Sequence, residues 1–144
     1  MDQAIEPRDV VQIDLDKRRI AIVVRLSGEF AEIVYGQATA GRGHEHVLVK
    51  PETRAGKALQ LYKDTYFAAS HVRLVRISSV QRIGRCPPGL YLDIREIAEA
   101  GRIRNLVRPV PPVTATDLRN LVLEAPGKMR GRPRVVYPAG GEST

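Results

Sequence analysis

The chain has little cysteine and few aromatic residues. Of its 144 residues one is a cysteine, Cys86, none is a tryptophan, and aromatic residues make up 5%. A disulfide framework within the chain is therefore excluded. No His and Cys residues have the spacing of zinc ligands, so we predict neither a metal site nor a cofactor. We interpret Cys86, which precedes two prolines, as a small packed apolar residue and not as a nucleophile.

Long apolar runs are also missing. No stretch approaches the roughly 18–20 apolar residues of a membrane-spanning helix. The first residues, MDQAIEPRD, are acidic and lack an apolar centre, so they do not resemble a signal peptide. We therefore expect a cytoplasmic protein.

Positive charge, in contrast, is in excess. The net charge is +7 and the isoelectric point is near 10.0. Residues 101–144 carry eight Lys or Arg against three Asp or Glu, so most of the excess lies there. A basic balance indicates an anionic partner, which is a nucleic acid, an acidic protein or a membrane surface.

The basic end of the chain contains a short motif, Arg-Gly-Arg-Pro, at residues 130–133. It resembles an AT-hook, in which glycine lets the backbone approach the minor groove of A·T-rich DNA, proline holds it extended and arginines enter the groove. The predicted DNA-binding residues are Lys128, Arg130, Arg132 and Arg134. The alternative, a solvated basic tail, stays open.

Residues 17–39, KRRIAIVVRLSGEFAEIVYGQAT, predict a β-hairpin. Apolar residues alternate along its first half, which predicts a strand with one buried face, and Ser-Gly-Glu at 27–29 has turn chemistry. In a hairpin, the start of one strand lies beside the end of the other. Arg18 and Arg19 should therefore meet Gln37 and Thr39 at one rim, where guanidinium, amide and hydroxyl groups suit a phosphate.

The remaining pattern predicts a small, curled antiparallel sheet closed by a helix. We expect one domain over residues 7–103 and, over 104–144, a Pro-containing linker, a short helix at 116–125 and the basic tail, disordered when free. Thr53 can cap a helical turn, and Asp93 and Gly101 bound a short helix. Tyr62, Tyr66 and Phe67 have rings that can stack on bases, but their spacing favours packing in the core, above all for Phe67. Further strands are predicted at 9–15, 46–50, 64–67, 71–78 and 80–85.

Six segments follow one another along the chain: PRDVVQIDLD, RRIAIVV, IVYGQAT, AGKALQLYKDTYF, SHVRLVRISSVQRIGR and the helix at Asp93. In this order, and over roughly residues 7–100, they resemble the MazF/PemK toxins of bacterial type II toxin–antitoxin pairs. That resemblance implies an SH3-like β-barrel with a few helices, a homodimer, a cognate antitoxin and metal-independent cleavage of single-stranded RNA.

The resemblance also implies a site. Arg19 matches the family's arginine, which would stabilise the anionic phosphorane. Gln37 stands where the family has Thr or Ser after Tyr-Gly, and Thr39 is two residues further on. We therefore predict Arg19 and Thr39 as catalytic residues. The predicted substrate-binding residues are Arg18, Gln37, His44 and Arg73.

Other functions are compatible with the same residues. A MazF-like domain that has lost catalysis would bind nucleic acid, with DNA held through the tail, and a purely structural interaction protein would leave the basic tail unexplained. His44 and His46, two residues apart in HEH, would face one side of a strand. Two histidines and one carboxylate fall short of a metal site, so we interpret them as a polar loop.

Overall fold

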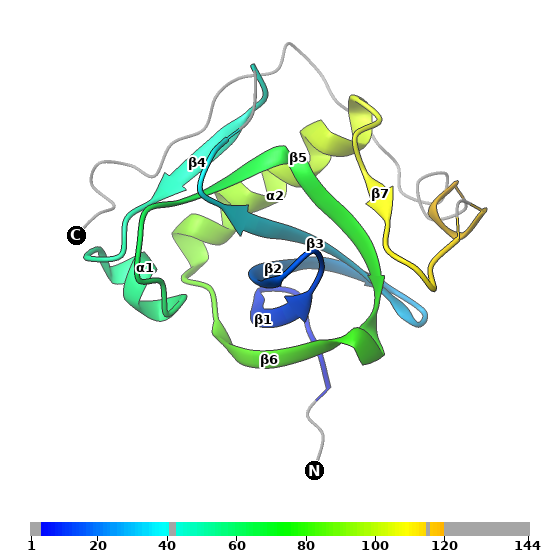
Figure 1. Ribbon diagram of the computed structural model, residues 1–144, viewed down its shortest axis with the longest axis horizontal. Helices are drawn as coiled ribbons and strands as arrows, with labels where there is room; N and C mark the ends of the chain where they lie inside the picture. The colour runs from blue at the N-terminus through cyan, green and yellow to red at the C-terminus, as the bar shows by residue number, and fades with distance from the viewer. Residues whose placement is uncertain (1–3, 41–42, 115, 120–144) are drawn as a thin grey trace.

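A mainly antiparallel sheet is the largest element of the fold in a computed structural model that describes residues 4–40, 43–114 and 116–119. Figure 1 shows these elements. The strands are β1 (Asp9–Asp14), β2 (Arg18–Ser27), β3 (Phe30–Gln37), β4 (His46–Val49), β5 (Thr65–Arg76), β6 (Val80–Arg85) and β7 (Arg108–Pro109), and the helices are α1 (Arg54–Ala58), the 3₁₀ turn η1 (Ile77–Ser79) and α2 (Pro88–Ile103).

The strands form one strongly curled sheet in the order β4-β5-β3-β2-β1-β6, with β7 parallel to β5 and all other pairs antiparallel. Figure 1 shows β5 and β6 running around β1, β2 and β3, with α2 behind the sheet. α2 packs mainly against β5. This arrangement confirms the predicted mainly-β fold with short helices. None of the described helices has the length and apolarity needed to cross a membrane.

The predicted hairpin is β2 and β3, which turn at Gly28 with a left-handed φ of 59°. The expectation of one buried face is wrong, because residues 21–24 of β2 are all buried. Even-numbered residues such as Ile22 contribute to the main core beneath α2. Odd-numbered residues such as Val23 belong to a second apolar cluster, which partly buried side chains including Val110 complete on the other face.

β5 is one strand of twelve residues, although the sequence predicts two separate strands at 64–67 and 71–78. No Gly or Pro lies between these stretches, so nothing stops the extended backbone. β5 pairs with β4 through residues 65–68 and with β3 along most of its length. The register between β3 and β5 shifts between Val34 and Gly36.

α2 is longer than the predicted helix at 93–101. It begins at Pro88, because proline suits the first helical position, where its missing N–H is not needed. Asp93 lies inside the helix. Gly101 does not end it: a Cβ there would lie 2.8 Å from the Ala69 carbonyl oxygen, so the glycine allows α2 to approach β5. The left-handed residue is Asn105, with a φ of 58°.

The apolar core continues beyond residue 103, where the sequence places the end of the domain. Val107 and Val113 are buried in the main core. Residues 116–119 are helical, and the reciprocal hydrogen bonds between Thr114 and Asp117 form a capping box at their start. The rest of the predicted helix at 116–125 and the whole tail, including Lys128, Arg130, Arg132 and Arg134, lie outside the described residues.

Candidate functional site

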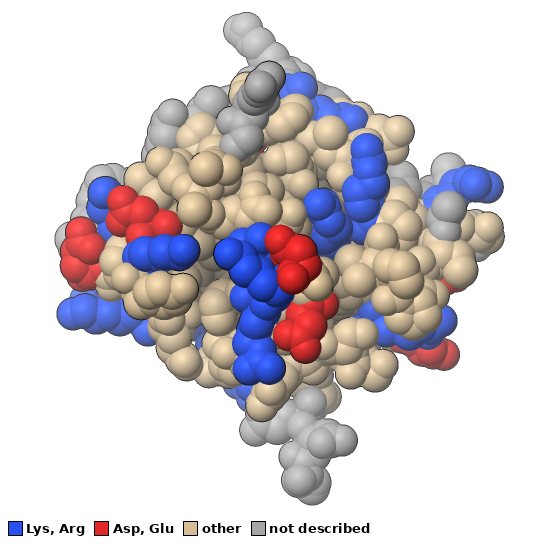
Figure 2. Space-filling view, in the orientation of Figure 1, with Lys and Arg blue, Asp and Glu red and all other residues tan. Residues whose placement is uncertain are grey.

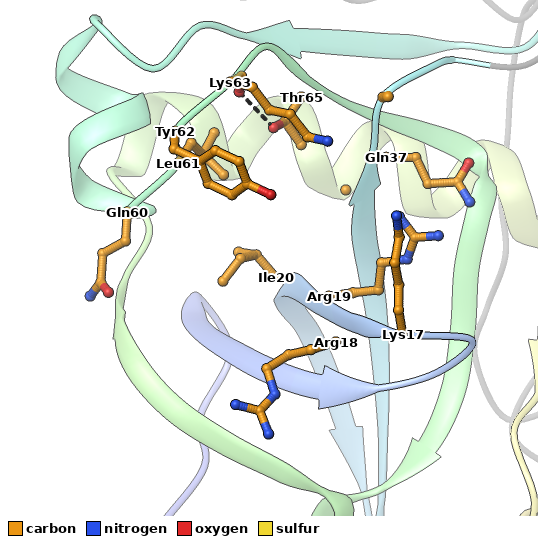
Figure 3. Close-up of a pocket in the computed structure, with 12 residues that line it drawn as sticks. Lys17, Arg18, Arg19, Ile20, Gln37, Gln60, Leu61, Tyr62, Lys63 and Thr65 are labelled. Atoms are coloured by element: carbon orange, nitrogen blue, oxygen red, sulfur yellow. Dashed lines mark hydrogen bonds between the residues drawn. The ribbon is translucent and has the colours of Figure 1, made fainter.

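A cationic pocket lies where β2 begins, β3 ends and the loop from α1 to β5 passes over them (Figure 3). Its volume is about 160 Å³, and none of the residues that line it is acidic. We call it the arginine pocket. It is lined by Lys17, Arg18, Arg19, Ile20, Gly36, Gln37, Ala38, Gln60, Leu61, Tyr62, Lys63 and Thr65.

Gly36 allows β3 and β5 to lie close together behind the pocket. A Cβ at this position would be 2.3 Å from Cγ2 of Thr65 and 3.2 Å from Cζ of Phe67. Separations this short are not tolerated in a packed interior. Backbone atoms of β3 therefore form part of the pocket wall, next to the Thr65 side chain.

Arg19 is held by two contacts. Its Nε and Nη2 donate to the two carboxylate oxygens of Asp16 at 3.1 and 2.8 Å. Its Cζ lies 5.6 Å from the centroid of the Tyr35 ring, which is a cation–π distance. The hydrogen bonds from Arg19 lower the pKa of the Asp16 carboxyl below its usual range. Arg19 is thus oriented beside the pocket by an ionised carboxylate and an aromatic face.

Tyr35 connects Arg19 to Arg73. The Tyr35 hydroxyl accepts hydrogen bonds from Nη2 of Arg73 at 3.1 Å and from Nε2 of Gln37 at 3.5 Å. Cζ of Arg73 lies 5.1 Å from the ring centroid, and the ring stacks on His71 with centroids 4.9 Å apart. We call Arg19, Tyr35, Gln37, His71 and Arg73 the tyrosine cluster.

His71 is neutral in this cluster. Its pKa is lowered from 6.5 to about 4, mainly by burial and in smaller part by the charge of Arg73. Its Nδ1 accepts a hydrogen bond from the Ala68 backbone N–H at 3.2 Å. Since it does not line the arginine pocket, we assign it to holding the Tyr35 ring.

Three of the predicted site residues, Arg18, Arg19 and Gln37, line the arginine pocket. Thr39 does not: β3 ends at Gln37, so Thr39 follows the strand as an exposed residue and does not share its face. The threonine hydroxyl at the pocket belongs to Thr65, which donates to the Lys63 carbonyl at 2.9 Å. The sequence does not single out Thr65, because it lies about thirty residues further along the chain.

The other predicted contacts lie away from the pocket lining. Arg73 belongs to the tyrosine cluster, and His44 is half-buried beside His46, whose Nδ1 is 3.0 Å from the His44 carbonyl oxygen. Glu45 between them is buried and is bound by both Nε and Nη2 of Arg104. Within the described ranges no three side chains are placed to hold a metal ion.

The structure agrees with the interpretation of Cys86 and adds two residues to the site, Tyr35 and His71. Cys86 is buried, and burial raises the pKa of its thiol to about 12, which agrees with a packed apolar residue. Tyr35 and His71 were not predicted as site residues. The signal for Tyr35 was its position two residues before Gln37, which places both side chains on one face of the strand.

Basic side chains gather over the middle of the face shown in Figure 2, above β1 and β2, with carboxylates directly beside them. Arg18 pairs with Asp14 at 3.4 Å, and Arg19 pairs with Asp16. Both partners of the first pair are exposed, so that pair contributes little to stability.

No protein-family model and no curated protein matches the sequence. Among solved structures, the Mycobacterium tuberculosis toxin MazF-mt6 is similar with a TM-score of 0.50 and 14% identity, over 65% of this chain and 95% of that one. MazE–MazF (form II) from Deinococcus radiodurans has a TM-score of 0.49 and 15% identity, over 65% and 90%. The curled sheet, the helix behind it and the likeness to the M. tuberculosis toxin together show that this chain has a MazF/PemK-like fold.

Proposed function

We propose that the protein is the toxin of a type II toxin–antitoxin pair and cleaves single-stranded RNA without a metal ion. The observation that carries this proposal is Arg19, which is oriented by Asp16 and Tyr35 at an acid-free cationic pocket. The MazF-like fold supports it, since a solved structure similar to this chain is named as a toxin.

The chemistry requires charge stabilisation above all. The ribose 2′ oxygen attacks the adjacent phosphorus, the bond from phosphorus to the 5′ oxygen breaks, and a 2′,3′-cyclic phosphate and a 5′ hydroxyl remain. Negative charge builds on the non-bridging oxygens of the phosphorane. The guanidinium of Arg19 can bind two of these oxygens at once. Gln37 donates from its amide but transfers no proton, and Arg18 and Lys63 hold neighbouring phosphates.

Asp16 occupies the donors of Arg19 that the phosphate would use. It is largely exposed, with 68% of its side chain accessible, so water solvates it as soon as it is released. An entering phosphate therefore replaces one anion by another at the same guanidinium. The antitoxin in this proposal is an acidic segment that covers the arginine pocket and competes with RNA for these donors.

We also propose that the protein acts as a homodimer, in which two barrels lengthen the track for RNA. Light scattering at micromolar concentration should give twice the mass of the chain. A monomer mass would exclude the dimer.

The test of cleavage uses purified protein and RNA in EDTA, with the ends of the products mapped. Wild-type protein should leave 2′,3′-cyclic phosphates, and Arg19→Ala should lose roughly a hundred- to a thousandfold in rate, as expected for one missing transition-state contact.

Arg76→Ala is the matched control, because Arg76 also pairs with a carboxylate, Glu29 at 2.6 Å, and lies 4.8 Å from an aromatic centroid, that of Phe30. It does not line the pocket. Equal cleavage by wild type and Arg19→Ala would remove Arg19 from the mechanism.

A second candidate function is nucleic-acid binding without catalysis. It is favoured by the lining of the arginine pocket, which contains no histidine and no Thr39. In that case the wild-type protein retains RNA in EDTA but produces no cyclic-phosphate ends. The same incubation therefore separates the two functions.

A further inference from the structure

Tyr62 is the one aromatic residue among the large apolar side chains that the described part of the chain exposes. It is 85% exposed, whereas Phe67, five residues later, is fully buried. The expectation of core packing is thus correct for Phe67 and wrong for Tyr62. A single exposed apolar side chain is ordinary on a protein surface, so what distinguishes Tyr62 is the place where its ring lies.

The ring of Tyr62 belongs to the arginine pocket. In Figure 3 it projects from the loop between α1 and β5 into the space facing β2, toward Ile20, and lies across the pocket from Arg18 and Arg19. Nζ of the neighbouring Lys63 is 5.6 Å from the ring centroid. One aromatic face therefore shares a pocket with four cationic side chains, those of Lys17, Arg18, Arg19 and Lys63.

The loop that carries Tyr62 is fixed on both sides. Before it, the Leu61 N–H donates to the Gly56 carbonyl at 2.9 Å and Nε2 of Gln60 donates to the Ile83 carbonyl at 3.1 Å. After it, Oγ1 of Thr65 donates to the Lys63 carbonyl. These bonds hold the residues on both sides of Tyr62, which lowers the entropic cost of ordering its side chain on a ligand.

We propose that Tyr62 stacks on an unpaired base while the adjoining phosphate lies between Arg18 and Arg19. This inference rests on the proposed function, and it names the residue that selects single-stranded over duplex substrates. An aromatic face beside cations is the arrangement that holds single strands, because each base offers a face for stacking. The bases of a duplex are already stacked and have no free face. An acidic peptide would use the cations but would gain little from the ring.

The test measures binding apart from cleavage. Homopolymer 2′-O-methyl RNA octamers lack the attacking hydroxyl, so dissociation constants of the full-length protein can be measured by fluorescence anisotropy without turnover. Tyr62→Ala should bind about 5- to 100-fold more weakly, as expected for the loss of one stacked base. Tyr62→Phe keeps the ring and should restore binding. Leu92→Ala, which removes an exposed apolar side chain on α2, is the control and should bind as wild type.

A series of octamers with one abasic position each locates the stacked base. In the wild type, an abasic site at one position should weaken binding by about the same factor as Tyr62→Ala does. In Tyr62→Ala the same position should cost nothing further, because the partner of that base is already absent.

Different results would overturn the proposed cleavage by the arginine pocket and the proposed stacking by Tyr62. Equal affinity of wild type and Tyr62→Ala for single strands would overturn the stacking inference, even if Arg19-dependent cleavage stands. The inference is also overturned if Tyr62→Ala weakens the binding of duplex RNA, or of a polyglutamate peptide, by as large a factor as it weakens the binding of single strands. Tyr62-dependent binding in a protein that yields no cyclic phosphate would support the stacking inference and reject the nuclease.

Discussion

At the scale of single residues, Tyr35 organises the candidate site. It is buried, and its ring contacts two guanidinium groups and an imidazole, while its hydroxyl accepts from Arg73 and Gln37. Two cations can share one ring because each lies near its electron-rich π system. The position of Arg19 at the pocket therefore depends on a residue that does not itself line the pocket.

His71 should make the stability of the fold depend on pH. Its pKa is about 4 when folded and 6.5 as the reference value. The unfolded chain therefore binds a proton that the native protein does not. The free energy of unfolding is therefore unaffected by the titration of this histidine above about pH 6.5. It falls as the pH decreases toward 4, by up to about 3 kcal/mol.

Urea unfolding across this range, compared between wild type and His71→Gln, measures the contribution of this histidine. The wild type should lose more free energy of unfolding than the variant between about pH 7 and about pH 4. Parallel curves would show that His71 is not held neutral by the fold.

At the scale of elements, an ion-pair triad around a buried carboxylate joins β2, β3 and α2. Glu32 on β3 is 1% exposed and binds Arg25 of β2 at 3.1 Å and Arg102 of α2. The triad lies where the helix crosses the hairpin. Three elements are therefore connected through one carboxylate in addition to the apolar core.

Glu32→Ala should lower the free energy of unfolding by about 3–5 kcal/mol, because it leaves two partly buried guanidinium groups without their anion. Glu29→Ala is the control: Glu29 also pairs with an arginine, Arg76, but its side chain is 81% exposed. That change should cost less than about 1 kcal/mol. Chemical denaturation measures both, and equal losses would show that burial does not strengthen the triad.

The sequence predicts most elements, because alternation and turn residues act locally. The turn at Gly28, the cap of α1 by Thr53 and the strands β1, β4 and β6 follow from neighbouring residues alone. The sequence does not predict the start of α2 at Pro88, because proline and glycine in the tract 86–89 are typical of a break between elements. Gly101 was misinterpreted because its reason is a close approach to β5, which no local pattern reveals.

The candidate site follows from the sequence only in part. Arg18, Arg19 and Gln37 meet because a hairpin places its strand start beside its strand end. Tyr62 and Thr65 join them from a distant loop and strand, which requires the pairing of β3 with β5 and the space left by Gly36. These contacts depend on tertiary register, so the alternation of residues does not predict them.

At the scale of the whole molecule, positive charge is divided between the arginine pocket and the end of the chain. The described part holds the pocket, and residues 126–144 hold Lys128, Arg130, Arg132 and Arg134 against one acidic residue, Glu142. The two regions suit different ligands in our proposal. The pocket would bind single strands, and the tail would bind duplex DNA.

Removal of the tail should weaken DNA binding and leave the fold intact. Four phosphate contacts would give a salt dependence with a slope near −4 for double-stranded DNA, by the rule of about 0.9 per contact. Full-length protein and a 1–125 truncation can be compared on A·T-rich and G·C-rich duplexes over a salt series. An AT-hook predicts a larger loss on A·T-rich duplexes. Equal losses would indicate a plain basic tail, and no change in affinity or slope would show that the tail does not bind DNA.

The burial of β2 on both faces also limits which substitutions this strand can accept during evolution. In a strand with one solvent-exposed face, every second position tolerates polar replacements. Here residues 21–24 are all buried, so neither set of alternating positions is free. Natural variants should keep an unbroken apolar block at these positions while the exposed start of the strand diversifies. Sequence searches guided by an alternating pattern would overlook such variants.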